Sequence, residues 1–161
     1  MGVDGPGGGR RNKEMVLDFY NQRRRQLCKA ESNDAQLELV KLEEKFNVII
    51  ITQNVDDLHE RAGSSKVIHL HGELSKARST KDPNLIYDLS GKDIKAGDKC
   101  EKGSQLRPHI VWFGEMVPMM EEAINHSLDA DIFIIIGTSL VVYPAASLIE
   151  YVPESSPKYL I

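Results

Sequence analysis

The sequence has little cysteine and no long hydrophobic run. Of its 161 residues only Cys28 and Cys100 are cysteines, too few for a disulfide framework, so a reducing, cytoplasmic environment is the expectation. No apolar stretch reaches the ~20 residues that span a membrane, and no charged start followed by a short apolar segment marks a signal peptide. The sequence therefore predicts a protein that neither crosses a membrane nor depends on disulfides.

A strong charge of one sign is also absent. Lysine and arginine number 20 and the acidic residues 24, which gives a formal net charge of −4. This mixed, slightly acidic balance argues against nucleic acid as the main partner, because nucleic-acid binding needs a basic surface. With 41% hydrophobic residues, the chain is long enough for one domain with a hydrophobic core.

The first eleven residues are rich in glycine. Residues 1–11 contain five glycines and one proline, a composition typical of a flexible leader or linker. A glycine-rich loop that binds phosphate needs a strand before it and a helix after it, and no strand precedes this one. We expect a flexible leader here.

From residue 12 onward, hydrophobic patterns with the helical period alternate with β-branched runs. Asn33 and Gln36 have the spacing of a capping box within a helical segment over 12–46. Helices are expected at 12–30, 34–46, 56–61 and 118–128, and from Pro144. Strands are expected at 48–51, 67–70, 107–115, 131–136 and 158–161. This alternation predicts an α/β fold with a parallel sheet.

The stretch from Ser75 to Leu106 departs from this pattern. Lysine, aspartate, glycine and serine dominate it, and its apolar patch is short. We expect an exposed insert in place of core structure.

Polar residues follow two of the expected strands at the point where each ends. Ligands of open parallel sheets bind outside the carboxyl ends of the strands. Asn54 and Asp56 could bind hydroxyls or amides there, or polarise a water; alternatively, they cap the next helix. The group Gly137-Thr138-Ser139 offers donors for phosphate or ribose, or is an ordinary turn.

Two further places carry candidate chemistry. His71 precedes Gly72, which allows close backbone approach and an exposed imidazole suited to a general base; a lone histidine can also be structural. Tyr20 and Arg23 lie on one helical face, three residues apart. Arg23 either covers apolar surface with its stem, or grips a carboxylate together with Tyr20.

Four motifs in this order resemble the sirtuins, which are NAD-dependent protein lysine deacylases. The motifs are TQNVD at 52–56, HLHGE at 69–73, VWFGE at 111–115 and GTSL at 137–140. The resemblance runs from about Lys13 to the end and implies a Rossmann-like parallel sheet with a small helical or insert subdomain. YNQR at 20–23 is similar to the class that prefers succinyl, malonyl or glutaryl lysine and includes a bacterial enzyme also active on acetyl lysine.

The resemblance also implies a role for each candidate residue. His71 would be the general base, with Asn54 beside it at the catalytic centre, and the products would be free lysine, nicotinamide and O-acyl-ADP-ribose. NAD would be bound by Gln53, Asn54, Asp56, Gly137, Thr138 and Ser139. The acyl-lysine of a protein or peptide would be bound by Val111, Phe113, Gly114 and Glu115, and an acidic acyl group by Tyr20 and Arg23.

Three departures from the sirtuin pattern shape the remaining expectations. Sirtuins usually hold a structural zinc on four cysteines in the region of 75–106, where this sequence has only Cys100, so no zinc is expected. The family's opening strand with its Gly-Ala-Gly loop and the segment that contacts adenine are not found. Residues 12–161 thus resemble a partial catalytic domain. The alternatives are an impaired sirtuin that only binds acyl-lysine peptides, and a transferase or hydrolase acting on NAD.

Overall fold

The computed structural model describes residues 10–139 and 141–161. Most of the expected glycine-rich leader, residues 1–9, lies outside this range. The first helix already begins at Arg10, two residues before the expected start.

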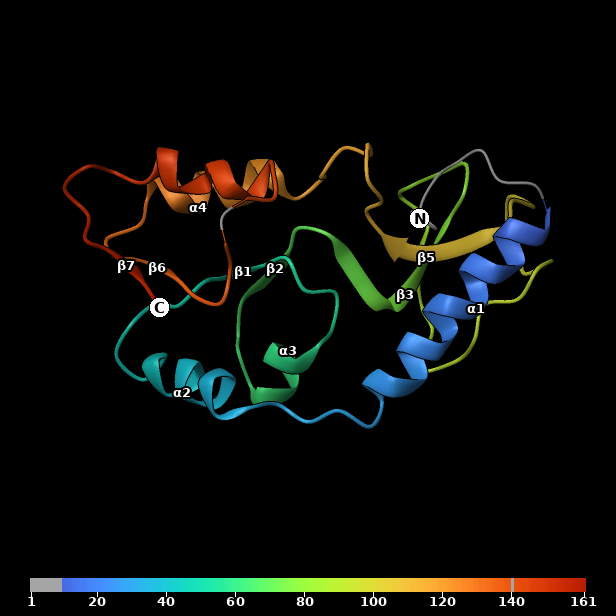
Figure 1. Ribbon diagram of the computed structural model, residues 1–161, viewed down its shortest axis with the longest axis horizontal. Coiled ribbons are helices and arrows are strands. Elements are labelled where there is room, and N and C mark those ends of the chain that lie inside the picture. Colours follow the sequence, from blue (N-terminus) through green and yellow to red (C-terminus); the bar gives the residue numbers. More distant parts are fainter. Residues whose placement is uncertain (1–9, 140) are drawn as a thin grey trace.

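The element order follows the expected alternation of helices and strands (Figure 1). The helices are α1 (Arg10–Leu27), α2 (Asp34–Leu42), α3 (Leu58–Ala62), α4 (Met120–Leu128) and the 3-10 helix η1 (Ala145–Tyr151). The strands are β1 (Ile50–Thr52), β2 (Val67–His69), β3 (Gly72–Ser79), β4 (Ile86–Asp88), β5 (Leu106–Ile110), β6 (Phe133–Ile135) and β7 (Lys158–Leu160).

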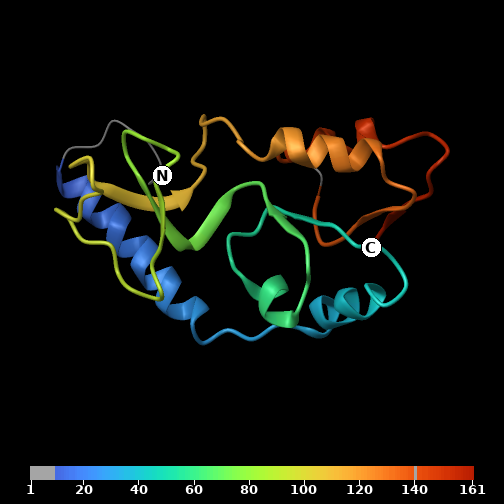
Figure 2. The same cartoon turned by 180° about the vertical axis from the view of Figure 1, so that it is seen from behind.

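The strands form two parallel pairs and one antiparallel sheet. β1 pairs with β2 in parallel, β6 pairs with β7 in parallel, and β3 lies between β4 and β5 in the antiparallel sheet. Figure 1 shows α1 along the antiparallel sheet at one end, with α4 and η1 on one side of the parallel pairs and α2 and α3 on the other. Figure 2 gives the same arrangement from behind. The expected α/β class is confirmed.

Local sequence signals set several of the element boundaries. The Asn33 side chain accepts a hydrogen bond from the Gln36 amide, and the Gln36 side chain accepts one from the Asn33 amide, which completes the expected capping box. Gly63 ends α3 with φ of 112°, a left-handed conformation that glycine adopts without steric cost. Among the described helices, none is long and apolar enough to cross a membrane.

Residues 80–103 are mostly exposed, as the composition predicts, but the stretch 75–106 also contributes to a core. β3 runs through its beginning, and Ala77 and Ile94 are 0% and 1% exposed because they pack with Leu17 of α1. The Asn21 side chain closes this contact: its Nδ2 donates to the carbonyl of Ile94 at 2.9 Å, and its Oδ1 accepts from the Ile94 amide at 2.9 Å. The polar composition of the 75–106 stretch gave no indication of this small core, which forms between α1 and residues far from it in the sequence.

A second core joins β2 to the helices on one side of it. Ile68 and Leu70 pack against Ala123 of α4 and against Ala145 and Leu148 of η1. This packing fixes the carboxyl end of β2, where the HLHGE motif begins.

Candidate active site

The loop after β1 is held by hydrogen bonds at four consecutive carbonyls. The acceptors are the backbone oxygens of residues 52–55, and every donor comes from residues 69–74. In order from Thr52 to Val55, the donors are the Leu70 amide at 3.0 Å, His71 Nδ1 at 3.1 Å, His69 Nδ1 at 3.2 Å and the Leu74 amide at 2.7 Å. Two imidazoles therefore continue the β1–β2 pairing beyond the end of the strands.

His71 has the tautomer that a general base needs. Because its Nδ1 faces the Gln53 carbonyl, that nitrogen must carry the hydrogen, and the neutral ring keeps its lone pair on Nε2. The His71 carbonyl also accepts from the Val111 amide at 2.9 Å, which joins the start of the 111–115 segment to the His71 backbone. This geometry fits a base at Nε2 and a structural donor at Nδ1 alike, so both interpretations of His71 remain open.

Gly72 explains why the backbone can turn at this point. Its φ is +83°, and a Cβ on this residue would lie 2.0 Å from the carbonyl oxygen of His109 in β5. The expected close approach of backbone at His71-Gly72 is therefore real, and it is an approach between β3 and β5.

Two polar candidates of this loop, Asp56 and Asn54, have different surroundings. The Asp56 carboxylate accepts a hydrogen bond from the Leu58 amide at 3.2 Å, at the start of α3, so Asp56 acts at least as a cap. Asn54 is exposed, and its amide donates to the Thr52 hydroxyl at 3.0 Å. The Asn54 side chain therefore stands on a fixed backbone at the surface of the loop.

One side-chain contact joins the two strand ends. Gln53 Nε2 donates to Thr138 Oγ1 at 3.3 Å across 85 residues of sequence. Gly137 has φ of +63°, its amide donates to the Ile161 carbonyl at 3.2 Å, and Ser139 is exposed. The structure thus brings GTS and TQNVD into contact at the ends of β6 and β1, two strands that belong to separate parallel pairs.

Tyr20 and Arg23 line a pocket beside this loop. The pocket has a volume of about 390 Å³ and is lined by Phe19, Tyr20, Arg23, Gln26, Leu27, Ala30, Val55, Asp56, Leu58 and Leu74. Tyr20 is 9% exposed, whereas Arg23 is exposed and its guanidinium lies 5.3 Å from the centre of the Phe19 ring. The guanidinium lies at the pocket, where it faces the Phe19 ring and donates to Gln26 Oε1 at 3.3 Å, so the structure leaves both interpretations of Arg23 open.

The 111–115 segment divides into an exposed part and an anchored part. Phe113 is 86% exposed, and Gly114 follows it with φ of +84°. The Glu115 carboxylate instead accepts from Arg78 at 2.9 Å, from Arg107 at 2.6 Å and from the Trp112 amide at 2.9 Å. The structure does not bring Glu115 to the other candidates, because its carboxylate anchors the segment.

The electrostatics of Glu115 follow from these contacts. Desolvation raises the pKa of its carboxyl, but hydrogen bonds from Arg107 and the Trp112 amide and the charges of Arg107 and Arg78 outweigh it, so the pKa lies below its usual value. Glu115 is therefore a charged anchor between two guanidiniums that are 10% and 13% exposed.

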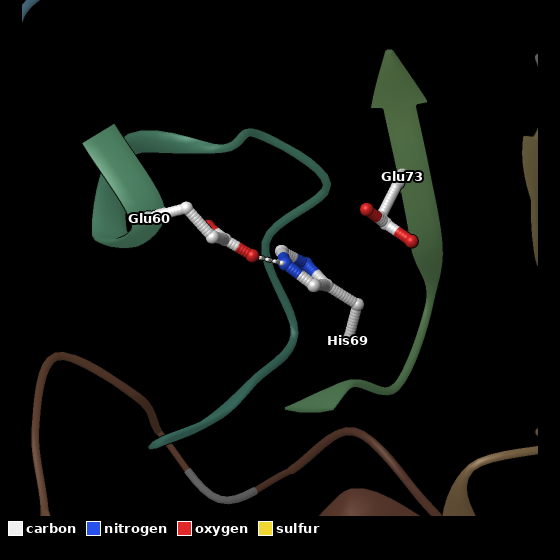
Figure 3. Close-up of side chains that lie close together, drawn as sticks. All are labelled: Glu60, His69 and Glu73. Carbon is white, nitrogen blue, oxygen red and sulfur yellow. Dashed lines mark hydrogen bonds and ion pairs between the residues drawn. The ribbon is translucent and has the colours of Figure 1, made fainter. Parts of the chain in front are cut away.

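The donors in the 75–106 stretch do not fit a structural zinc. Cys100 Sγ lies 3.4 Å from Ser79 Oγ, and the Cys100 amide donates to the Ser104 carbonyl. One thiol, one hydroxyl and one backbone carbonyl are not the four nitrogen or sulfur ligands of such a site. Within residues 10–139 and 141–161, the cluster of potential metal-ligand side chains is Glu60, His69 and Glu73 (Figure 3), and none of its members belongs to the 75–106 stretch.

Comparison with known proteins defines the class. Residues 3–144 match the Sir2 family, and the chain belongs to that family. A Helicobacter pylori protein named NAD-dependent protein deacylase is 56% identical over 161 residues, covering 100% of this chain and 70% of the relative. A Bacteroides thetaiotaomicron protein of the same name is 53% identical, covering 97% of this chain and 69% of the relative.

Solved structures agree with the family assignment. A Sir2 homologue in complex with NAD has a TM-score of 0.88 at 40% identity, covering 98% of this chain and 64% of that one. A Sir2 protein bound to an acetylated peptide has a TM-score of 0.70 at 34% identity, covering 92% of this chain and 71% of that one. The chain thus spans about two thirds of the length of such proteins.

Sequence reasoning missed three residues that shape the site. His69 Nδ1 contacts the Asn54 carbonyl, and Glu60 contacts His69 Nε2. Arg24 is 2% exposed, and its Nε donates to the Leu74 carbonyl at 2.8 Å, which ties α1 to the same segment. His69 could have been found from the sequence, because it belongs to the same HLHGE motif as His71. The burial of Arg24 could not, because it depends on tertiary contacts.

Proposed function

We propose that this protein is an NAD-dependent protein-lysine deacylase. The observation that carries the proposal is His71, an imidazole whose Nδ1 is fixed on the Gln53 carbonyl at the edge where two strand ends meet. The family, the names of the relatives, and the NAD and acetyl-peptide complexes of Sir2 homologues support the reaction class.

In this proposal NAD supplies an activated ribosyl centre, and the protein supplies position and a base. In this proposal the proton is accepted by Nε2 of His71, because Nδ1 already carries the hydrogen that is donated to the Gln53 carbonyl. Asn54 presents its amide from the fixed loop, beside Gln53. The remaining contacts to the cofactor are assigned to Asp56, Gly137, Thr138 and Ser139.

The acyl-lysine substrate would approach along the 111–115 segment. Phe113 exposes an apolar ring there, and Val111 is tied to the His71 carbonyl, so a lysine side chain passing these residues reaches the imidazole. We assign substrate contact to Val111, Phe113 and Gly114, with a peptide adding as an extended strand. Glu115 supports this segment through the two arginines.

The acyl preference is assigned to the pocket of Tyr20 and Arg23. A guanidinium and a phenol beside a pocket of about 390 Å³ suit the free carboxylate of a succinyl or malonyl group. Acetyl lysine lacks that carboxylate, so it would use the same tunnel without this contact.

Mass spectrometry of matched acetyl-lysine and succinyl-lysine peptides, with and without NAD, tests the activity. NAD-dependent loss of the acyl group is expected, and His71→Ala should lower the rate by about 10²–10⁴-fold while peptide binding is kept. Full activity of His71→Ala would remove His71 from the reaction. Peptide binding by the unaltered protein without any turnover would favour the acyl-lysine binding module instead.

Arg23→Met tests the acyl preference. Succinyl turnover should fall at least about tenfold more than acetyl turnover, because only the succinyl group has a carboxylate to lose its partner. Arg25→Met is the matched control, since Arg25 is on the same helix but pairs with Asp93. Equal losses on both substrates in Arg23→Met would show that Arg23 only covers apolar surface.

A further inference from the structure

The HLHGE motif contains a second imidazole whose surroundings differ from those of His71. His69 is 7% exposed, and Figure 3 shows its ring between the carboxylates of Glu60 and Glu73. Its Nδ1 lies 3.2 Å from the Asn54 carbonyl oxygen and its Nε2 lies 2.6 Å from Glu60 Oε1. Both ring nitrogens therefore face oxygen atoms.

Counting hydrogens separates the two histidines. A carbonyl and a carboxylate can only accept, so both contacts of His69 are hydrogen bonds only when both of its nitrogens carry hydrogen. The contact that His71 makes to Gln53 needs a hydrogen on Nδ1 alone. His71 thus retains a basic nitrogen, whereas His69 is bound at both.

The charged groups around His69 favour this doubly bound ring. Glu60 contacts it directly, and the nearest carboxylate oxygen of Glu73 lies within 4.8 Å of the other two ligand atoms of the cluster. Glu73 also accepts from Lys76 Nζ at 2.8 Å, and His59 is the further titratable group that interacts with the ring. Two carboxylates against one ammonium leave negative potential at the imidazole.

The same cluster has the wrong spacing for a metal ion. Two ligands of one zinc, each at ~2.0–2.1 Å in a tetrahedron, lie about 3.3 Å apart. His69 Nε2 and Glu60 Oε1 are 2.6 Å apart, which is shorter than that spacing and just below the ~2.7–2.9 Å of a charge-assisted N–H···O hydrogen bond. The geometry is that of a hydrogen-bonded pair.

We propose that His69 is a positioning residue that holds the Asn54 carbonyl, with Glu60 fixing the ring. This inference rests on the proposed function, because its purpose is to set the Asn54 side chain for the reaction at His71. In this arrangement the Glu60 carboxylate holds the His69 imidazole, and His69 in turn donates to the Asn54 carbonyl.

Two substitutions of His69 separate its contacts. His69→Asn places an amide nitrogen near the position of Nδ1 and keeps a donor for Asn54 while losing Glu60. His69→Gln places its amide nitrogen near Nε2, so it keeps Glu60 and loses Asn54. Both remove the ring, so a general packing role would affect them alike.

The expected result is a difference in kcat between the two variants. His69→Gln should lose about tenfold in kcat, the equivalent of one lost hydrogen bond, with an unchanged KM for the acyl peptide. His69→Asn should stay within about threefold of the unaltered protein. Equal kcat losses, at equal melting temperatures, would overturn the proposal.

Nuclear magnetic resonance tests the arrangement without any turnover. The ¹⁵N shifts should show hydrogen on both nitrogens of His69 and on Nδ1 alone of His71. The Asn54 carbonyl ¹³C shift should move in His69→Gln and stay in His69→Asn. A bare nitrogen on His69, or an unmoved carbonyl, would overturn the inference; an inactive protein with the expected shifts would overturn only the proposed function.

Discussion

The loop at 52–55 and the segment at 111–115 carry the same kind of expected role but are built differently. In the loop, every backbone carbonyl is bound by a donor from 69–74. In the segment, the His71 carbonyl holds one end and the arginine pairs of Glu115 hold the other, with an 86%-exposed Phe113 between them. The loop is held at each of its backbone carbonyls. The 111–115 segment, called the bridge below, is held only at its two ends.

This difference matches what each region would contact. Groups that act on a reacting centre need fixed geometry, because small displacements cost large factors in rate. A segment that receives a peptide needs an exposed surface and a free backbone. Rigidity in the loop comes from backbone and imidazole donors of residues 69–74, whereas the segment stays exposed because it is anchored only at its ends.

Gly72→Ala is the largest expected disturbance, because Gly72 is where both regions meet. The new Cβ would lie 2.0 Å from the His109 carbonyl at a φ of +83°, so stability should fall by more than about 3 kcal/mol in urea denaturation. Gly97→Ala is the matched control: its φ is +101°, but no described atom beyond its neighbours lies within 4 Å of the Cβ. Similar losses in both would mean that strain alone, and not the close approach, matters at Gly72.

Glu115→Gln removes one anchor of the segment. Arg78 and Arg107 would lose their common carboxylate while remaining 10% and 13% exposed, so unfolding free energy should fall by about 2–3 kcal/mol. Chemical denaturation checks this, and Asp82→Asn, which breaks the exposed pair with Lys102, should have a much smaller effect. If Glu115→Gln left both stability and peptide KM unchanged, the bridge would have only one anchor.

Phe113→Ala tests the exposed part of the bridge. Because the ring is 86% exposed, the melting temperature should hardly move, with a stability change within about 0.5 kcal/mol. The KM for an acyl-lysine peptide should rise roughly threefold or more if the ring contacts the substrate. Steady-state kinetics measure this, and a lowered melting temperature with unchanged KM would make Phe113 a packing residue.

A further expected effect is a pH dependence set by His109. Burial, with the charge of Arg78 next, lowers the pKa of His109, so the unfolded chain, with a histidine pKa of about 6.5, binds the proton first. Stability should therefore fall as the pH drops through about 6.5, by at most ~1.4 kcal/mol per pH unit. His109→Gln should flatten this slope without removing it, because burial also lowers the pKa of His59. An unchanged slope would show that His109 does not contribute.

Local signals in the sequence were sufficient for much of the fold. The capping box of Asn33 and Gln36, the glycine that ends α3, and the apolar runs of β1, β2 and β6 depend on near neighbours. The contact between Gln53 and Thr138 also agrees with the strand-end argument, although β1 and β6 lie in separate parallel pairs. These features depend on the spacing of apolar residues and on capping and turn residues, which can be identified in a single sequence.

Features built from distant partners could not be predicted in this way. Arg78 is buried in β3 because Glu115, 37 residues later, neutralises it, and no local pattern shows that pairing. The core around Ala77 and Ile94 likewise needs α1 to cover it. For the same reason the sequence suggested substrate contact for Glu115, where the structure shows an anchor.

The hydrogen bonds to the four carbonyls of residues 52–55 have a consequence for local unfolding of the protein. Donors that stand 15 and 18 residues after their acceptors tie the loop to the β2–β3 turn. Hydrogen exchange at the Leu70 and Leu74 amides, which bind the outer two carbonyls, should therefore occur in one shared opening event. The protein would then keep its reaction loop and its supporting turn as a single cooperative unit, present together or lost together.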